Sequence, residues 1–197
     1  MPQLRYNVAT SLDGYIASPD GSADWNIDDS TIDFDALYEE FDFFVMGRKT
    51  YETMLSFGGP DENRLCNRPK KNVIVASRSL KPEDFPGITI LSTNVVEFIR
   101  QLKLGAGKDI WLMGGNNLAT QCLRAGLVDT IEAAVMPVVL GDGIKLMEAI
   151  DSTENLPVRL NLLGSERLES GIIMTSGGNR ENCHIDQENG PQVDGVA

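Results

Sequence analysis

Two continuous apolar runs most constrain what this chain can fold into. The segments NVIVAS (72–77) and DIWLM (109–113) place apolar residues at consecutive positions instead of alternating them with polar ones. Such runs are typical of parallel strands that are covered on both faces. Apolar residues recur at helical spacing over 95–102 and 118–123. Strands alternating with helices in this way predict an α/β fold with a mostly parallel, doubly wound central sheet and helices on both faces.

The pattern changes towards the C-terminal end. Segments 130–143 and 158–177 have strand character and no helical segment between them, which predicts antiparallel strands and a hairpin at the sheet edge. From residue 178 onward the chain is rich in Gly, Asn, Asp and Gln. We therefore expect one domain over residues 1–177 and a flexible polar tail over 178–197.

Composition and charge exclude several classes of protein. The chain has 197 residues and a net charge of −12, which argues against a general nucleic-acid binder because phosphate-backbone binding draws on clustered Lys and Arg. No run of about 18 apolar residues is present, so we expect no membrane span and a cytoplasmic protein. Cys66, Cys122 and Cys183 are widely spaced and form no CxxC motif, which is typical of reduced thiols.

The histidine content narrows the chemistry further. His184 is the only histidine, and it lies in the predicted tail. A Ser-His-Asp or Cys-His hydrolase and a histidine-ligated metal site each need a histidine on the folded scaffold. We therefore predict neither of them, and no metal site.

The stretch VMGRKTYE (45–52) places Arg48 and Lys49 where a predicted strand ends and a predicted helix begins. Cations in the first turn of a helix are disfavoured by about 0.3–1 kcal/mol each unless an anion shares the site, because the helix N-terminus carries partial positive charge. Gly47 lets backbone amides approach a ligand closely, and Thr50 adds a hydroxyl. The motif indicates a local anion site; a surface helix start with incidental charges is the alternative.

Two other predicted strands end in residues that suit a nucleotide. Ser77 and Arg78 offer a hydroxyl and a guanidinium to a phosphate on a ribose, although such residues are also common in loops. Gly114 and Gly115 permit either close packing of a helix on a strand or close approach of the backbone to a pyrophosphate. Neither GxGxxG nor GxxxxGK[ST] occurs, so a standard Rossmann dehydrogenase and a P-loop nucleotidase are not supported.

The three strand ends are expected to meet, because ligands in open α/β sheets collect at the carboxyl ends of the parallel strands. Together they describe a groove for a ligand with several phosphates. A dinucleotide with a ribose 2′-phosphate would use all three ends, which points to NADPH as the cofactor.

These motifs, in this order, resemble those of the dihydrofolate-reductase-like superfamily, and most of all its branch with the riboflavin-biosynthesis reductase domain, the C-terminal domain of a bifunctional deaminase-reductase. The resemblance covers about residues 4–177 and rests on SLDGYIA, MGRKTYE, VIVASRS, LMGGNNLATQCLRAGLVDTIEAAVMPVVLGDG and LESGIIMTS. It implies a dihydrofolate-reductase-like three-layer fold with a C-terminal antiparallel hairpin. It also implies hydride transfer from NADPH to a small-molecule substrate, with the protein supplying positioning and electrostatics.

The resemblance also implies where the cofactor binds. The phosphates of NADPH would lie at Gly47, Arg48, Lys49 and Thr50, and the adenosine ribose with its 2′-phosphate at Ser77 and Arg78. The pyrophosphate and the nicotinamide ribose would lie along Gly114, Gly115, Asn116, Asn117 and Leu118. The nicotinamide carboxamide would lie at the backbone of Ala9, Ile16 and Ala17.

The catalytic carboxylate is less well marked. Dihydrofolate reductases carry an acid in the first helix at a point near Ser30 and Thr31 of this chain, where no acid falls. Asp33 is the catalytic residue that we predict, with a helix N-cap as its alternative role. Asp13 is expected only to form a turn.

The substrate follows from the branch. DGYIA and PVVLGDG favour the riboflavin-type reductase, in which NADPH reduces the ribosyl group of 5-amino-6-(5-phosphoribosylamino)uracil. We expect a stand-alone reductase domain without the zinc deaminase domain, and stand-alone members of the branch also suit other carbonyl, imine or pterin-like substrates. Backbone amides of 138–147 and Lys145 could bind a substrate phosphate, or Gly141 and Gly143 could only shape a turn. Dihydrofolate reductase and a non-catalytic nucleotide-binding protein are the alternative functions. A homodimer is expected, because many members of the branch pair through their sheets.

Overall fold

The computed structural model describes residues 1–56, 63–149 and 158–179 of the chain. Its helices are α1 (Phe34–Glu39), α2 (Arg48–Ser56), α3 (Val95–Lys103) and α4 (Asn116–Arg124), with short 3-10 turns η1 (Lys70–Asn72) and η2 (Pro82–Asp84). Its strands are β1 (Leu4–Ser11), β2 (Tyr15–Ala17), β3 (Phe41–Gly47), β4 (Val73–Ala76), β5 (Thr89–Leu91), β6 (Asp109–Gly114), β7 (Thr130–Met136), β8 (Ile144–Lys145), β9 (Leu160–Arg167) and β10 (Ile173–Asn179).

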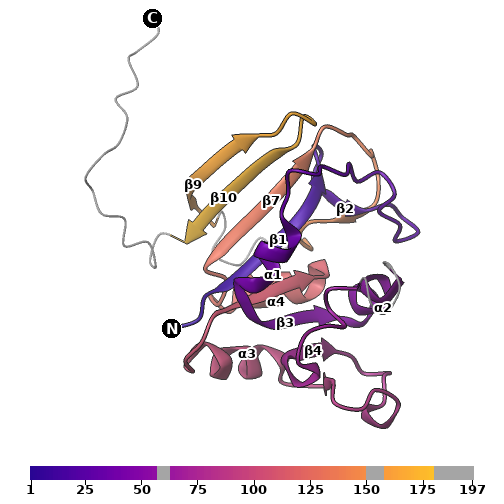
Figure 1. Ribbon diagram of the computed structural model, residues 1–197, viewed down its shortest axis with the longest axis vertical. Helices are drawn as coiled ribbons and strands as arrows, with labels where there is room; N and C mark the ends of the chain where they lie inside the picture. The colour runs from indigo at the N-terminus through magenta and orange to yellow at the C-terminus, as the bar shows by residue number, and fades with distance from the viewer. Residues whose placement is uncertain (57–62, 150–157, 180–197) are drawn as a thin grey trace, which may run out of the picture.

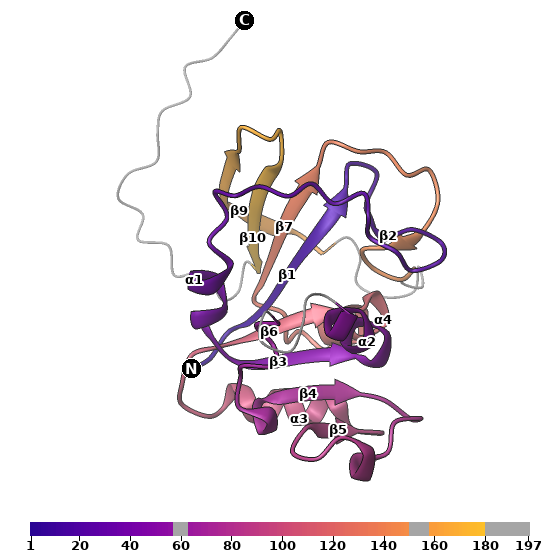
Figure 2. The same cartoon turned by 45° about the vertical axis from the view of Figure 1, so that its right-hand side comes forward.

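An eight-stranded sheet forms the centre of the molecule, in the order β5-β4-β3-β6-β1-β7-β10-β9 (Figures 1 and 2). The strands from β5 to β7 are all parallel, whereas β10 is antiparallel to both of its neighbours, β7 and β9. The two remaining strands, β2 and β8, form a separate antiparallel pair. The carboxyl ends of β1, β3, β4, β5 and β6 therefore lie along one edge of the sheet.

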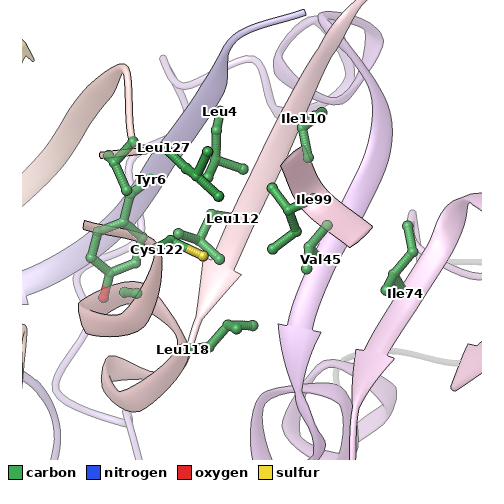
Figure 3. Close-up of a cluster of buried hydrophobic side chains, with 12 residues drawn as sticks. Leu4, Tyr6, Val45, Ile74, Ile99, Ile110, Leu112, Leu118, Cys122 and Leu127 are labelled. Atoms are coloured by element: carbon green, nitrogen blue, oxygen red, sulfur yellow. The ribbon is translucent and has the colours of Figure 1, made fainter. Parts of the chain in front are cut away.

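One face of the parallel region is covered by α3 and α4. Ile99 of α3 and Leu118 and Cys122 of α4 pack with strand residues such as Leu4 and Leu112 (Figure 3). All five side chains are buried. This packing is the reason that the apolar positions of the two helices recur at helical spacing.

The opposite face is covered by α1 and α2. Tyr38 of α1 packs on Phe44 and Trp111, with ring centroids 5.4 and 4.9 Å apart. Val45 packs in the cluster with Ile99 and Leu118 on the α3 and α4 face, whereas its neighbour Phe44 packs with Tyr38 on the opposite face. Successive strand side chains point to opposite faces, so a strand buried on both sides needs a continuous apolar run. The structure thus confirms the three-layer fold with a doubly wound sheet and a C-terminal antiparallel hairpin.

Two details of the fold differ from the predictions. β10 runs through Asn179, so residues 178 and 179 belong to the sheet and not to the tail. The pairing of β2 with β8 was not predicted, because β8 has only two residues and its apolar pattern carries no strand signal. Residues 180–197 of the predicted tail, with Cys183 and His184, lie outside the described residues.

The two described cysteines differ in their surroundings. Cys66 is exposed and Cys122 is buried, and both are free thiols. Burial raises the pKa of Cys122 to about 12, so its thiol stays protonated at neutral pH. None of the helices in the described part of the chain has the length and apolar character that crossing a bilayer requires.

Candidate functional site

A cleft of about 1770 Å³ lies along the sheet edge where the parallel strands end. Residues at the carboxyl ends of β3, β4, β5 and β6 contribute to its lining, together with the first residues of α2, α3 and α4. Sites for drug-sized ligands occupy about 300–1,000 Å³. The cleft therefore has room for a dinucleotide and a second small molecule.

The structure brings most of the predicted cofactor residues together. Of the set, only Ala9 and Gly114 are absent from the lining. The residues that line the cleft are Ile16, Ala17, Gly47, Arg48, Lys49, Thr50, Ser77, Arg78, Gly115, Asn116, Asn117 and Leu118. Segments separated by up to a hundred residues thus share one cavity, although what each residue binds stays a prediction.

The first turn of α2 supplies cations to the cleft. Arg48 donates from Nη1 to both carboxylate oxygens of Glu52, at 2.7 and 2.9 Å. Among the described residues, no ion pair involves the cleft cations Lys49, Arg78 or Lys145, all of which are exposed. These three side chains are available to an anionic ligand as they stand.

The loop after β4 is shaped by Ser77. The Oγ of this buried residue accepts hydrogen bonds from the amides of Ser79 (3.2 Å) and Leu80 (3.0 Å), and its own amide donates to the carbonyl of Leu91 on the β5 side. The loop therefore turns tightly, and Arg78 projects from it into the cleft. Ser77 thus supports Arg78 whether or not it also touches a ligand.

The glycine pair between β6 and α4 is joined by a cis peptide bond. Gly114 has a φ of +110°, which favours glycine, whereas Gly115 has an ordinary φ of −77°. A Cβ added at Gly115 would lie 3.7 Å from Oγ1 of Thr50, an ordinary contact. The protein itself therefore requires glycine at 114 but leaves room for a methyl group at 115, at the cleft wall.

The N-terminal turn of α4 is tied to the segment after β8. Asn117 donates from Nδ2 to Glu148 (2.8 Å) and accepts at Oδ1 from Gln121 (2.7 Å). The amide of Glu148 in turn donates to Oγ1 of Thr120 (2.9 Å). The side-chain amide of Asn117 is thereby held in one orientation beside the cleft.

Asp33 has a structural role in the described geometry. It is the N-cap of α1, and its Oδ1 accepts a hydrogen bond from the amide of Ala36 at 2.9 Å. Asp33 is not among the residues that line the cleft. Its catalytic role stays a prediction, and the capping role that was its alternative is present.

The structure bears on the two roles that were expected for the segment with Gly141 and Gly143. The amides of Leu140 and Gly141 donate to the carboxylate of Asp13, so these two donors already have a partner. Gly141 and Gly143 both have positive φ, at +76° and +150°. They shape a turn, while Lys145 lines the cleft.

Sequence reasoning missed a fourth strand end. Ser92, Thr93 and Asn94 follow β5, precede α3 and line the cleft. The signal was present, because a polar Ser-Thr-Asn run between a predicted strand and a predicted helix obeys the same rule as the other three ends. The acidic lining residues were missed as well; they are Asp20, Glu52, Glu97 and Glu148.

A family model for the RibD C-terminal domain matches residues 2–174 of the chain. The chain belongs to the RibD C-terminal domain family. Its match to this family confirms the resemblance that the sequence motifs indicated, and it covers every strand end that lines the cleft.

Relatives of this family member are found in several bacteria. The Bacillus subtilis protein named "Uncharacterized protein YyaP" is 31% identical over 179 residues, which cover 87% of this chain and 92% of the relative. The riboflavin biosynthesis protein RibD of Mycobacterium tuberculosis is 27% identical over 160 residues, which cover 76% of this chain but 46% of RibD. The chain thus corresponds to about half of RibD.

Solved structures support the same assignment. A Shewanella sp. PV-4 protein that carries a riboflavin-biosynthesis description superposes with a TM-score of 0.71 at 26% identity, over 90% of this chain and 98% of that one. Dihydrofolate reductase from Enterococcus faecalis, solved with NADP(H), superposes with a TM-score of 0.61 at 15% identity, over 90% and 96% of the two chains. The latter likeness confirms the dihydrofolate-reductase-like fold and carries nothing about function.

Proposed function

We propose that this protein is an NADPH-dependent reductase that transfers a hydride to a small substrate in the manner of the riboflavin-biosynthesis reductases, with 5-amino-6-(5-phosphoribosylamino)uracil or a related compound as substrate. The observation that carries the proposal is the gathering of Lys49, Arg78 and the Gly115–Asn116 turn in one cleft at the strand ends. Its membership of the RibD C-terminal domain family supports the reaction type. We also propose that the protein works in the cytoplasm, a location that suits its free thiols.

The protein residues would bind and orient the two ligands. When bound, NADPH would supply the hydride. Lys49 and Arg78 would hold phosphate oxygens by charge-assisted hydrogen bonds, and Arg48 could join them by leaving Glu52. The proton would come from water or from Asp33, the predicted catalytic residue.

The cofactor part is tested by calorimetric titration with NADPH and NADH. Arg48→Ala combined with Arg78→Ala should weaken NADPH much more than NADH, because a 2′-phosphate would lose charged hydrogen bonds worth about 1.5–3 kcal/mol each. Arg64→Ala combined with Arg167→Ala is the matched control, since it removes the same charge at residues outside the cleft lining. Equal losses for both cofactors would contradict the placement of the 2′-phosphate at these residues.

The two other functions are separated by a substrate screen. Loss of reduced-nicotinamide absorbance is followed with the phosphoribosylaminouracil, with other carbonyl or imine compounds, and with dihydrofolate. Oxidation with dihydrofolate alone would favour a dihydrofolate reductase. Binding of NADPH without oxidation by any of them would favour a non-catalytic binder.

A further inference from the structure

One wall of the cleft is built from two segments that are distant in sequence. Residues 138–146, here called the strap, pass beside the β1–β2 turn, and β8 within the strap pairs with β2. The amide of Leu12 donates to the carbonyl of Val138 (2.8 Å), and the amide of Leu146 donates to the carbonyl of Gly14 (2.9 Å). Gly143, Ile144 and Lys145 of the strap line the cleft beside Ile16 and Ala17 of β2.

The strap approaches β2 closely. A Cβ at Gly143 would lie 2.3 Å from the carbonyl oxygen of Ala17, a distance that real Cβ atoms do not reach. Position 143 therefore requires glycine, and the strap backbone packs directly on β2.

The Asp13 carboxylate joins the two segments. Its Oδ2 accepts from the amide of Gly141 at 2.7 Å, and its Oδ1 accepts from the amide of Leu140 at 3.1 Å. The hydroxyl of Ser11 also donates to Oδ1 (2.7 Å), while the same hydroxyl accepts from the amide of Tyr15 (2.9 Å). These hydrogen bonds, of which the one from Ser11 has the largest effect, lower the pKa of Asp13 to about 2. The carboxylate therefore stays charged at neutral pH.

We propose that Asp13 is a positioning residue for the cleft: its carboxylate clamps the strap to the β1–β2 turn and so sets the wall formed by Ile16, Ala17 and residues 143–145. Asp13 itself is not among the residues that line the cleft. The inference rests on the proposed function for the identity of the ligand that meets this wall.

The clamp acts on one end of the cleft only. The sheet order places β4 and β5, whose ends carry Arg78 and Ser92–Asn94, on the far side of β3 and β6 from β1. In the proposed binding mode, the adenosine half of NADPH lies at β4 and the nicotinamide half at the wall beside β2. Loss of the clamp should therefore affect the nicotinamide half alone.

The test uses Asp13→Asn, which keeps the shape of the side chain but places an N–H group against the strap amides. Two probes are titrated by calorimetry: NADPH, which spans the cleft, and adenosine 2′,5′-bisphosphate, which reaches only the β4 end. Hydrogen exchange of the strap amides is measured in parallel. Asp42→Asn is the matched control, because Oδ2 of Asp42 also accepts from a distant backbone amide, that of Lys108, near the amino-terminal end of β6.

The expected result is a loss of NADPH affinity of about tenfold with the bisphosphate changed by less than about twofold, because preorganisation is lost at one wall. Strap amides should exchange faster in this variant and not in Asp42→Asn. Equal weakening of both probes, or no weakening of either, would overturn the proposal. Asp13→Ala removes the carboxylate without adding a hydrogen-bond donor, and it decides the matter if Asp13→Asn does not fold.

Failure of the proposed function would look different. In that case the unsubstituted protein would bind neither probe, and the role of Asp13 in cofactor binding would fall with it. The exchange measurement would still report whether the carboxylate holds the strap.

Discussion

At the scale of single residues, the affinity of the cleft for an anion depends on how each of its cations is already paired. Arg48 is shared with Glu52 in an exposed pair, of a kind worth about 0.3–0.5 kcal/mol in a helix, so a phosphate can displace the glutamate at low cost. Lys49 lies beside it in the first turn of α2, where the helix dipole disfavours a cation. A bound anion would relieve this electrostatic conflict.

Gly115 separates a structural role of the glycine pair from a ligand-binding role. We expect Gly115→Ala to fold with little change in thermal midpoint, because the added methyl group meets Thr50 at an ordinary 3.7 Å. The same methyl group lies at the cleft wall, so NADPH affinity should fall by about tenfold or more, which corresponds to about 1.4 kcal/mol.

Gly114→Ala is the contrasting variant for this prediction. Its φ of +110° disfavours alanine, so the stability of that variant should fall as measured by urea unfolding. Undiminished NADPH affinity in Gly115→Ala would contradict a close approach of the cofactor to this backbone.

At the scale of elements, strands and helices were predictable where one periodicity dominates. The apolar runs of β4 and β6 and the helical stripes of α3 and α4 all reappear, since each reports burial on known faces. The β2–β8 pair and the clamp by Asp13 were not predictable, because both depend on contacts between segments more than a hundred residues apart. Asp13 was expected to form a local turn only.

Substitutions at Asp33 distinguish its role as the N-cap of α1 from a catalytic role. Asp33→Ala should lower the free energy of unfolding by about 0.5–2 kcal/mol, because the amide of Ala36 loses its capping acceptor. Asp33→Asn should retain most of that stability, since asparagine is also a good N-cap. Urea unfolding gives the stabilities, and NADPH oxidation with a working substrate gives the activities.

The two Asp33 variants discriminate between the roles. A cap-only Asp33 predicts that Asp33→Asn keeps both stability and activity. A stable Asp33→Asn protein that has lost turnover would assign the carboxylate to catalysis.

At the scale of the whole molecule, the sheet has a covered half and an open half. The helices lie over the parallel strands, whereas no described helix covers β10 and β9 (Figures 1 and 2). Apolar side chains are exposed there, including Leu160, Leu162 and Ile173, the second at 71%. Exposed apolar patches of this kind are typical of interfaces.

We expect this open half to form the interface of the homodimer that the sequence resemblance implies. Light scattering after gel filtration should give the mass of a dimer for the unsubstituted chain. Leu162→Lys combined with Ile173→Lys should give a monomer of normal stability, because charges would be buried without partners in the interface. Leu104→Lys, at an exposed residue that follows α3, is the control and should leave the mass unchanged.

Stability should fall in acid. The pKa of Asp13 lies at about 2 in the folded protein, and hydrogen bonds from Arg5 hold the pKa of Glu132 below its usual value although burial raises it. The unfolded chain therefore binds more protons, so this stabilisation is complete above about pH 5 and is lost as pH falls towards about 2. The urea midpoint should therefore decrease from about pH 5 to about pH 2, and it should decrease less in Asp13→Asn. An equal decrease in that variant would contradict the stabilisation by the hydrogen-bonded Asp13 carboxylate.

The position of β6 has a consequence for synthesis of the chain. β6 lies between β1 and β3, yet it follows β3, β4 and β5 in sequence. A nascent chain that has not reached Gly114 therefore cannot join its first strand to the others, and the glycine turn, α4 and the strap complete the cleft only afterwards. A ligand stabilises only the state that binds it, so we expect the cofactor to assist folding only after the strap has left the ribosome.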